Sequence, residues 1–306
     1  MSTILIGLLI TGVSLAVPLL LAALGELVAE KSGVINVGIE GTVLMGAFGA
    51  FAGSHYMHSA FGGALCGIAC ALLLASLFIG IGVFMGADQV VAGTAINILS
   101  LGLTGVLNRG LFNGNEASPP RFNPVPLPVL HSIPVLGPTV FSQSLLGYCG
   151  WLLVPITWAW LMRTRAGLCL RAAGEYPAAA DAVGASVVRI RAGAALWGAA
   201  LAGLAGAYLS IGYNSGFVEN MSAGRGFIAL AVVILGRWNP FGVLIAALFF
   251  GIAMATQYQF QALHTAFPYQ FFLALPYLLT LGALLVRRGK SYTAAPAFLG
   301  QPFRRM

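Results

Sequence analysis

The stretch RTRAGLCLRAAGEYPAAADAVGASVVRIR, residues 163–191, decides how the chain is arranged, because long apolar runs lie on both sides of it. It holds five of the fifteen basic residues and two of the eight acidic ones. Residues 174–177 predict a turn, and the proline that ends it suits the first turn of a short helix over residues 177–185, where no N–H donor is needed. A small helix on a basic loop between two membrane spans is typical of a docking element. An ordinary positively charged loop is the alternative.

The composition places the whole chain in a membrane. Of its 306 residues, 59% are hydrophobic and only 8% are charged, with a mean hydropathy of +0.91. Soluble domains have about a quarter of their residues charged. Apolar runs of about 20 residues recur, which predicts spanning helices that contact the lipid bilayer. The net charge of +7 does not indicate nucleic acid, because the basic residues cluster at the ends of the spans.

The apolar runs predict an all-α integral membrane protein with about nine transmembrane or half-membrane helices in a single domain, residues 1–306. The segment 109–140 holds seven of the fifteen prolines, so it predicts a folded cap outside the cytoplasm, and 287–306 is a basic tail. The expected helices cover residues 4–24, 37–53, 60–85, 90–107, 141–161, 192–211, 227–235, 243–262 and 271–286.

Two of these helices follow polar, glycine-rich segments. Residues 25–41 lead into the second expected helix, which begins at residue 37 within them. Residues 213–226 lead into the helix over 227–235, which is too short to cross about 30 Å at 1.5 Å per residue. Both are typical of broken helices that line a polar path, and they predict a possible inverted repeat, since they would start from opposite sides. An interfacial loop and a chance similarity are the alternatives.

Charge sets the expected orientation. With residues 163–191 in the cytoplasm and alternating spans, twelve basic residues lie inside and three outside, as the positive-inside rule requires. The C-terminus is then cytoplasmic and the N-terminus outside.

Catalytic motifs are not found. The sequence contains no phosphate-binding loop, no H-E-x-x-H and no G-x-S-x-G, so we expect a transport subunit that is not an enzyme and binds no metal or cofactor. Glu40 is the one carboxylate expected inside the membrane, which disfavours a free-standing secondary carrier.

Four blocks in order resemble the permease subunits of ATP-binding-cassette importers for nucleosides, simple sugars and branched-chain amino acids, and most closely the smaller permease of nucleoside importers. The resemblance covers nearly the whole chain. The blocks are GELVAEKSGVINVGIEG (25–41), GADQVVAGTAINILSLGLT (86–104), RAAGEYPAAADAVGASVVRIR (171–191) and GRGFIALAVVILGRWNPFG (224–242).

This resemblance implies a channel in the bacterial cytoplasmic (inner) membrane formed with a second permease, identical or homologous. A cytoplasmic ATPase would use ATP and Mg²⁺, and an extracytoplasmic binding protein would deliver the substrate. Nucleosides are expected ahead of simple sugars and branched-chain amino acids. In this family the G-E-x-P-x-A-A-D-A-x-G pattern is the coupling helix that fits the ATPase. The coupling positions carried over are Gly174, Glu175, Pro177, Ala179, Ala180, Asp181, Ala182 and Gly184.

Polar residues in or beside the spans are the candidates for the substrate path, because burying them without a partner is costly. They are Asn36, Glu40, Asn97, Asn108 and Asn214. Each could instead satisfy a neighbouring backbone group.

Overall fold

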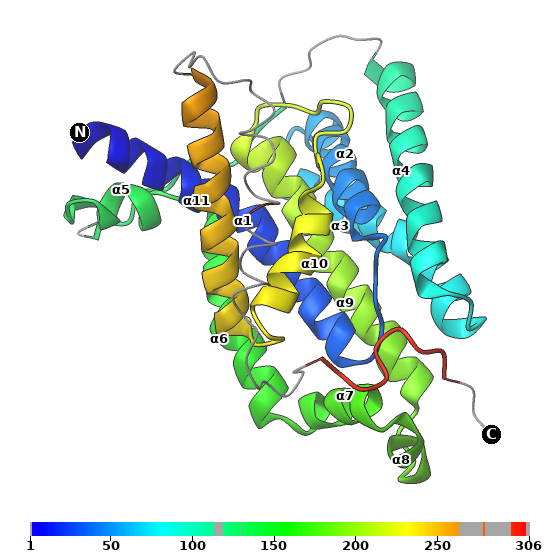
Figure 1. Ribbon diagram of the computed structural model, residues 1–306. Coiled ribbons are helices and arrows are strands. Elements are labelled where there is room, and N and C mark those ends of the chain that lie inside the picture. Colours follow the sequence, from blue (N-terminus) through cyan, green and yellow to red (C-terminus); the bar gives the residue numbers. More distant parts are fainter. Residues whose placement is uncertain (1, 113–118, 129, 263–277, 279–294, 304–306) are drawn as a thin grey trace.

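Figure 1 shows the computed structural model of the chain, a bundle of helices that describes residues 2–112, 119–128, 130–262, 278 and 295–303. All regular elements of these residues are helical, apart from an isolated bridge between Pro124 and Ser144. Among the described residues, six helices are long and apolar enough to cross a membrane. The α-helices are α1 (Ser2–Lys31), α2 (Ile39–Met57), α3 (Ala60–Phe78), α4 (Gln89–Phe112), α5 (Leu136–Val140), α6 (Leu145–Arg163), α7 (Arg165–Glu175), α8 (Pro177–Ala182), α9 (Val187–Ala207), α10 (Arg225–Leu235) and α11 (Pro240–Ala262). The other helical segments are two short π-helices, η1 (Ile79–Phe84) and η3 (Tyr208–Tyr213), and a 3-10 helix, η2 (Leu130–Ser132).

Eight of the nine expected helices are present, and the ninth, residues 271–286, lies outside the described residues except for Leu278. The main difference is α1, which continues past the predicted end at Leu24 to Lys31. The segment ELVAEK consists mostly of good helix formers, and the chain meets no breaker before Ser32 and Gly33. The helix α4 likewise continues to Phe112, so the proline-rich cap begins later than residue 109.

The helix α1 runs through the centre of the bundle, with α11, α9 and α10 against it, and α2 packs in turn on α9 (Figure 1). Glycines allow these contacts. A Cβ on Gly25 would lie 2.7 Å from the carbonyl oxygen of Gly198, and one on Gly46 would lie 2.7 Å from the Cα of Gly203. Small residues at a helix interface let two backbones approach closely. The Ala- and Gly-rich helix α9 therefore packs closely on its neighbours.

Two helices begin midway along the bundle and run in opposite directions. In Figure 1, α2 starts beside the middle of α9 and rises, whereas α10 starts at a similar level and descends. With 11 residues, α10 is about 16 Å long, roughly half of a hydrocarbon core. The extended residues 32–38 carry the chain from the end of α1 to the start of α2. These are the two broken helices that the glycine-rich segments predict.

The proline-rich cap folds against the end of the bundle that carries the N-terminus (Figure 1). Its strand-like residues pair with the chain that leads into α6, where the N–H of Val125 donates to the carbonyl oxygen of Gln143 at 3.0 Å. The N–H of Phe122 donates at 2.9 Å to the carbonyl oxygen of Ile211 in η3, which continues α9. These bonds satisfy backbone groups that the prolines prevent from forming a helix.

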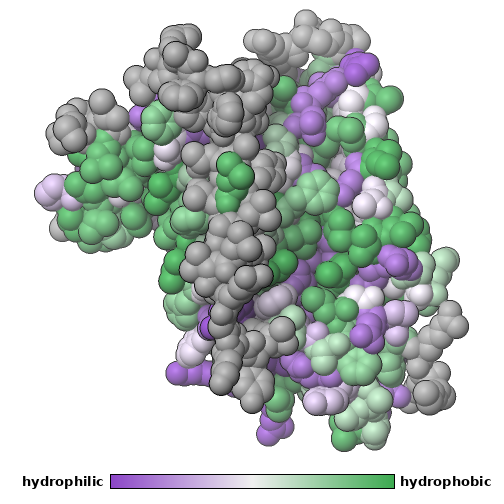
Figure 2. All heavy atoms as spheres, viewed as in Figure 1, coloured by the Kyte–Doolittle hydropathy of each residue, from purple (hydrophilic) through white to green (hydrophobic). Residues whose placement is uncertain are grey.

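The opposite end of the bundle carries α7, α8 and residues 295–303 (Figure 1). Figure 2 shows hydrophobic side chains over much of the coloured surface, with hydrophilic ones at this lower end and again at the upper end. The distribution fits a multi-pass membrane protein whose apolar sides face lipid.

Candidate functional site

The candidate site is the junction where the N-terminal ends of α2 and α10 meet. Glu40 lies in the first turn of α2 and is 8% exposed. Its carboxylate accepts the N–H of Gly224 at 2.7 Å through Oε1 and the N–H of Gly226 at 2.6 Å through Oε2. The first N–H groups of a helix have no partner within it and carry a partial positive charge. Glu40 therefore caps α10 from a different helix.

The close approach at this junction depends on glycine. A Cβ on Gly226 would lie 2.5 Å from the Cα of Glu40 and 2.6 Å from its nitrogen. Gly224 has a φ of +81°, a backbone conformation that favours glycine. The two glycines bring the start of α10 within hydrogen-bonding reach of the Glu40 carboxylate.

Asn97 on α4 holds the start of α2 from the other side. Its Nδ2 donates to the carbonyl oxygen of Val37 at 2.9 Å, and its Oδ1 accepts the N–H of Gly41 at 2.7 Å. One turn later, Ser100 donates its hydroxyl to the carbonyl oxygen of Gly41 at 2.6 Å. The amide of Asn97 thus replaces the hydrogen bonds that an extended chain and a first helical turn cannot make for themselves.

The extended segment before α2 is also bound by buried polar side chains. The N–H of Asn36 donates to Oε1 of Glu26 at 2.8 Å, and the N–H of Ile35 donates to Oε1 of Gln89 at 2.8 Å. Asn36 is 3% exposed, and its Oδ1 has no hydrogen-bond partner among the described residues. The extended segment before α2 thus holds one buried hydrogen-bond acceptor that the described residues leave unused.

Three of the five predicted path residues therefore lie around the start of α2: Asn36, Glu40 and Asn97. The other two do not join them. Asn108 lies eleven residues, about 16 Å, farther along α4. Asn214 is exposed where η3 ends, with its N–H donating to Leu209 at 3.1 Å.

Near Asn108, an exposed ion pair joins α4 to the loop that leads into α10. The guanidinium of Arg109 donates to both carboxylate oxygens of Glu219, at 2.8 Å and 3.0 Å. This hydrogen bond from Arg109 lowers the pKa of Glu219 below its usual 4.5.

Two buried carboxylates escaped the sequence-based prediction, which placed Glu40 alone inside the membrane. Glu26 and Glu30 lie one turn apart on α1 and are 1% and 2% exposed. Oε2 of Glu30 accepts the indole N–H of Trp238, in the turn between α10 and α11. The spacing of the two glutamates on an uninterrupted run of helix formers was the available signal, since i and i+4 share one helix face.

The predicted coupling segment forms two helices rather than a turn and one helix. Residues 174 and 175 complete α7, and Tyr176 alone separates it from α8, which begins at Pro177 as expected. The hydroxyl of Thr164 accepts the N–H of Gly167 at 3.0 Å and so caps α7. The helix α8 ends at Ala182, three residues before the predicted end, and Gly184 has a φ of +88°.

Within this segment the coupling positions differ in exposure. Gly174, Pro177 and Ala180 are buried, Glu175 and Asp181 are half-buried, and Gly184 is exposed. A Cβ on Gly174 would collide with the carbonyl oxygen of Lys31. The base of the α7–α8 segment therefore packs directly on the end of α1, while α8 projects beyond the ends of the spans (Figure 1).

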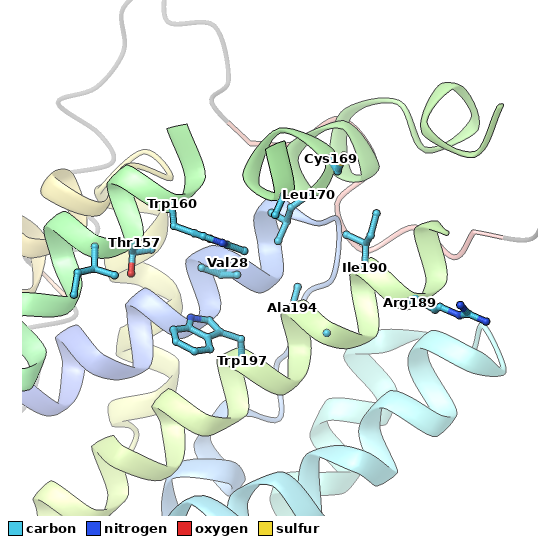
Figure 3. A pocket seen from close by; sticks show the side chains of 12 residues that line it. Val28, Thr157, Trp160, Cys169, Leu170, Arg189, Ile190, Ala194 and Trp197 are labelled. Atoms are coloured by element: carbon cyan, nitrogen blue, oxygen red, sulfur yellow. The ribbon is translucent and has the colours of Figure 1, made fainter. Parts of the chain in front are cut away.

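A cavity of about 560 Å³ lies between α1, α6, α7 and α9. Figure 3 shows Trp160 and Trp197 across from each other over Val28, whereas the guanidinium of Arg189 points away from them. Among the labelled residues around the two indoles, Thr157 has the only polar side chain. The cavity therefore offers few hydrogen-bonding groups to orient a polar solute.

Comparisons with known proteins agree with this architecture. The family model described as "Branched-chain amino acid transport system / permease component" matches residues 8–284. The guanosine ABC transporter permease protein NupQ of Bacillus subtilis is 34% identical over 302 residues, covering 94% of this chain and 93% of its own. TsgC13 of Haloferax volcanii, provisionally named a glucose ABC transporter permease, is 36% identical and covers 85% of this chain and 79% of its own.

Among solved structures, a provisionally assigned metal-chelate type ABC transporter in an inward-facing conformation has a similar fold. The TM-score is 0.53 at 16% identity, over 92% of this chain and 85% of that one. The bundle, the interrupted helices and the match over nearly the whole length lead to one conclusion: the chain belongs to the permease-component family of ABC transporters.

Proposed function

We propose that the chain is the membrane subunit of an ATP-driven importer in the bacterial cytoplasmic membrane, and that it passes an uncharged polar solute of the nucleoside class. A second permease completes the channel, a cytoplasmic ATPase drives it, and an extracytoplasmic binding protein supplies the solute. ATP and Mg²⁺ belong to the ATPase, and this chain contributes the path and the coupling helix.

The placement of Glu40 is the observation that favours an uncharged solute. The N-terminus of a half-helix inside a membrane is a ready binding site for an anion, such as the carboxylate of an amino acid. Here the carboxylate of Glu40 already accepts two N–H groups at the start of α10. A substrate carboxylate would be repelled at that position, whereas hydroxyl and amide groups would find acceptors.

The names of two relatives support the same class. NupQ is named for guanosine and TsgC13 for glucose, which are both uncharged and rich in hydroxyl groups. Because NupQ is aligned over 94% of this chain and TsgC13 over 85%, nucleosides are the first proposal and simple sugars the second.

The uptake of labelled guanosine, glucose and leucine by proteoliposomes that contain the whole transporter tests the solute. Guanosine uptake that depends on ATP and resists an excess of leucine is expected. Leucine competing as well as unlabelled guanosine would contradict the argument from Glu40, and ATP-driven uptake of glucose alone would move the assignment to sugars.

The α7–α8 segment supports the coupling role. It projects beyond the spans, its helix α8 is small and alanine-rich, and its base packs on the end of α1. Reversing charge at Glu175 and Asp181 together, as Glu175→Arg with Asp181→Arg, should abolish uptake by weakening contact with the ATPase, while membrane insertion persists. Normal transport by the double variant would refute the coupling assignment.

A further inference from the structure

Residues 295–303 form a segment, here called the strap, that lies across the end of the bundle carrying α7 and α8. Figure 1 shows it beside the end of α1, the start of α9 and α7. It has no helix or strand of its own; the N–H groups of Leu299 and Gln301 bond within it, and other backbone groups find partners elsewhere in the chain. Those partners belong to three separate elements.

The strap bonds first to the base of the coupling segment. The N–H of Phe298 donates to the carbonyl oxygen of Gly174 at 3.0 Å, and the N–H of Ala297 donates to Oε2 of Glu175 at 3.2 Å. Farther along, the N–H of Gly300 donates to the carbonyl oxygen of Gly33 at 3.0 Å. The strap thus links α7 to the chain between α1 and α2.

Arg191 on α9 fastens the same two parts. Its side chain is 2% exposed, and its Nε donates to the carbonyl oxygen of Ser32 at 3.2 Å. Its Nη1 donates to the carbonyl oxygen of Gln301 in the strap at 2.7 Å. These two bonds use Nε and Nη1 of the buried guanidinium, whereas its Nη2 has no hydrogen-bond partner among the described residues, and they hold Arg191, the strap and residue 32 in one arrangement.

An apolar contact joins the strap to the coupling helix itself. Phe303 packs against the cluster formed by Ala173 of α7, Ala180 of α8 and Val187 of α9. The buried face of α8 therefore rests partly on the strap. A displacement of α8 would press on Phe303, and the hydrogen bonds above would carry it to residues 32–33.

We propose that the strap, together with Arg191, is a positioning element that transmits movement of α8 to the extended segment before α2. This inference rests on the proposed coupling function. From residue 33 the connection continues through the N–H of Asn36 to Glu26 and through Val37 to Asn97, which hold the start of α2. ATP-driven movement of α8 thereby shifts the junction of α2 and α10.

The test measures coupling in the intact transporter with its ATPase. Arg191→Met removes both bonds made by the guanidinium, and deletion of residues 295–306 removes the strap. Gln301→Ala is the matched control, because Arg191 contacts only the backbone oxygen at that position. The number of ATP molecules hydrolysed per guanosine imported is the readout, alongside the amount of ATPase that co-purifies.

We expect about a tenfold rise in ATP consumed per guanosine for Arg191→Met, which corresponds to about 1.4 kcal/mol of lost coupling. Arg191→Lys should raise the ratio of ATP to guanosine less than Arg191→Met does, and Gln301→Ala should keep the native ratio. The amount of co-purified ATPase should be unchanged in every variant. Phe303→Ala is the milder variant that serves if the deletion fails to insert.

Three outcomes separate the two proposals. An unchanged ratio in both Arg191→Met and Phe303→Ala would overturn transmission by the strap. ATPase lost in proportion to transport would also overturn it, since the strap would then build the docking surface instead. A native chain that imports without any ATPase would refute the proposed function itself.

Discussion

Replacing Glu40 with alanine removes both acceptors from the start of α10. The N–H groups of Gly224 and Gly226, bonded at 2.7 Å and 2.6 Å, would be left without that carboxylate. An unsatisfied buried donor costs about 1 to 3 kcal/mol, so Glu40→Ala should lower the free energy of unfolding by about 2 to 6 kcal/mol. Glu40→Gln keeps one acceptor oxygen and should lose about half of that.

Thr42→Val is the matched control in the same turn of α2. The hydroxyl of Thr42 donates to the carbonyl oxygen of Gly38 at 2.9 Å, and that oxygen also accepts the N–H of Thr42 at 3.0 Å. The carbonyl therefore keeps a partner in the variant, and we expect a loss of about 1 kcal/mol.

The assay is unfolding of the purified protein by sodium dodecyl sulfate titration in mixed micelles, followed by helical circular dichroism. The reasoning predicts the order Glu40→Ala, Glu40→Gln, Thr42→Val, from most to least destabilised. A Glu40→Ala protein within about 0.5 kcal/mol of the native one, the range of an ordinary surface change, would refute the capping of α10 by Glu40.

Three further predictions concern Gly226 and Asn97 at the junction and, apart from it, the ion pair of Arg109 with Glu219. Gly226→Ala should destabilise the protein by about 1 to 3 kcal/mol, because its Cβ would meet the backbone of α2 at 2.5 Å, while Gly102→Ala, with nothing within 4 Å, should be neutral or slightly stabilising in the same titration. Asn97→Leu leaves two backbone groups at the start of α2 without their partner, so both the affinity and the rate of guanosine uptake should fall; if neither changes, this residue leaves the substrate path. Because Arg109 lowers the pKa of Glu219, the pair stabilises the folded state above pH 4.5, and this contribution is lost as the pH falls through the lowered pKa. The difference in the free energy of unfolding between the native protein and Arg109→Met should therefore shrink from about pH 6 to about pH 3. A constant difference would contradict this reasoning.

The sequence-based predictions were strongest where a local property decides the structure. The spans could be located because an apolar run of about 20 residues is stable as a helix across the hydrocarbon core of the membrane. The start of α8 followed from Pro177, which suits a first helical turn. The predictions failed at helix ends, as at Leu24, because a polar helical turn and a polar loop have similar composition.

The candidate site was predicted only in part. Asn36, Glu40 and Asn97 were selected as polar residues near spans, and the structure brings them to the start of α2. Glu26 and Glu30 were placed in the polar segment before the second helix, and their burial became visible only when α1 was seen to continue to Lys31. Whether these residues contact the solute stays a prediction.

The amino-acid sequence by itself determined the membrane class, the positions of the spans and the start of the short helix α8, because hydropathy and the backbone preferences of proline and glycine are local properties of the chain. Only the tertiary structure decided which partner each buried polar group has. Glu40 bonds to Gly224, 184 positions away, and Arg191 bonds to Gln301, 110 positions away. Such pairs depend on how distant helices pack, because in a membrane the polar groups of the backbone must find their partners within the protein.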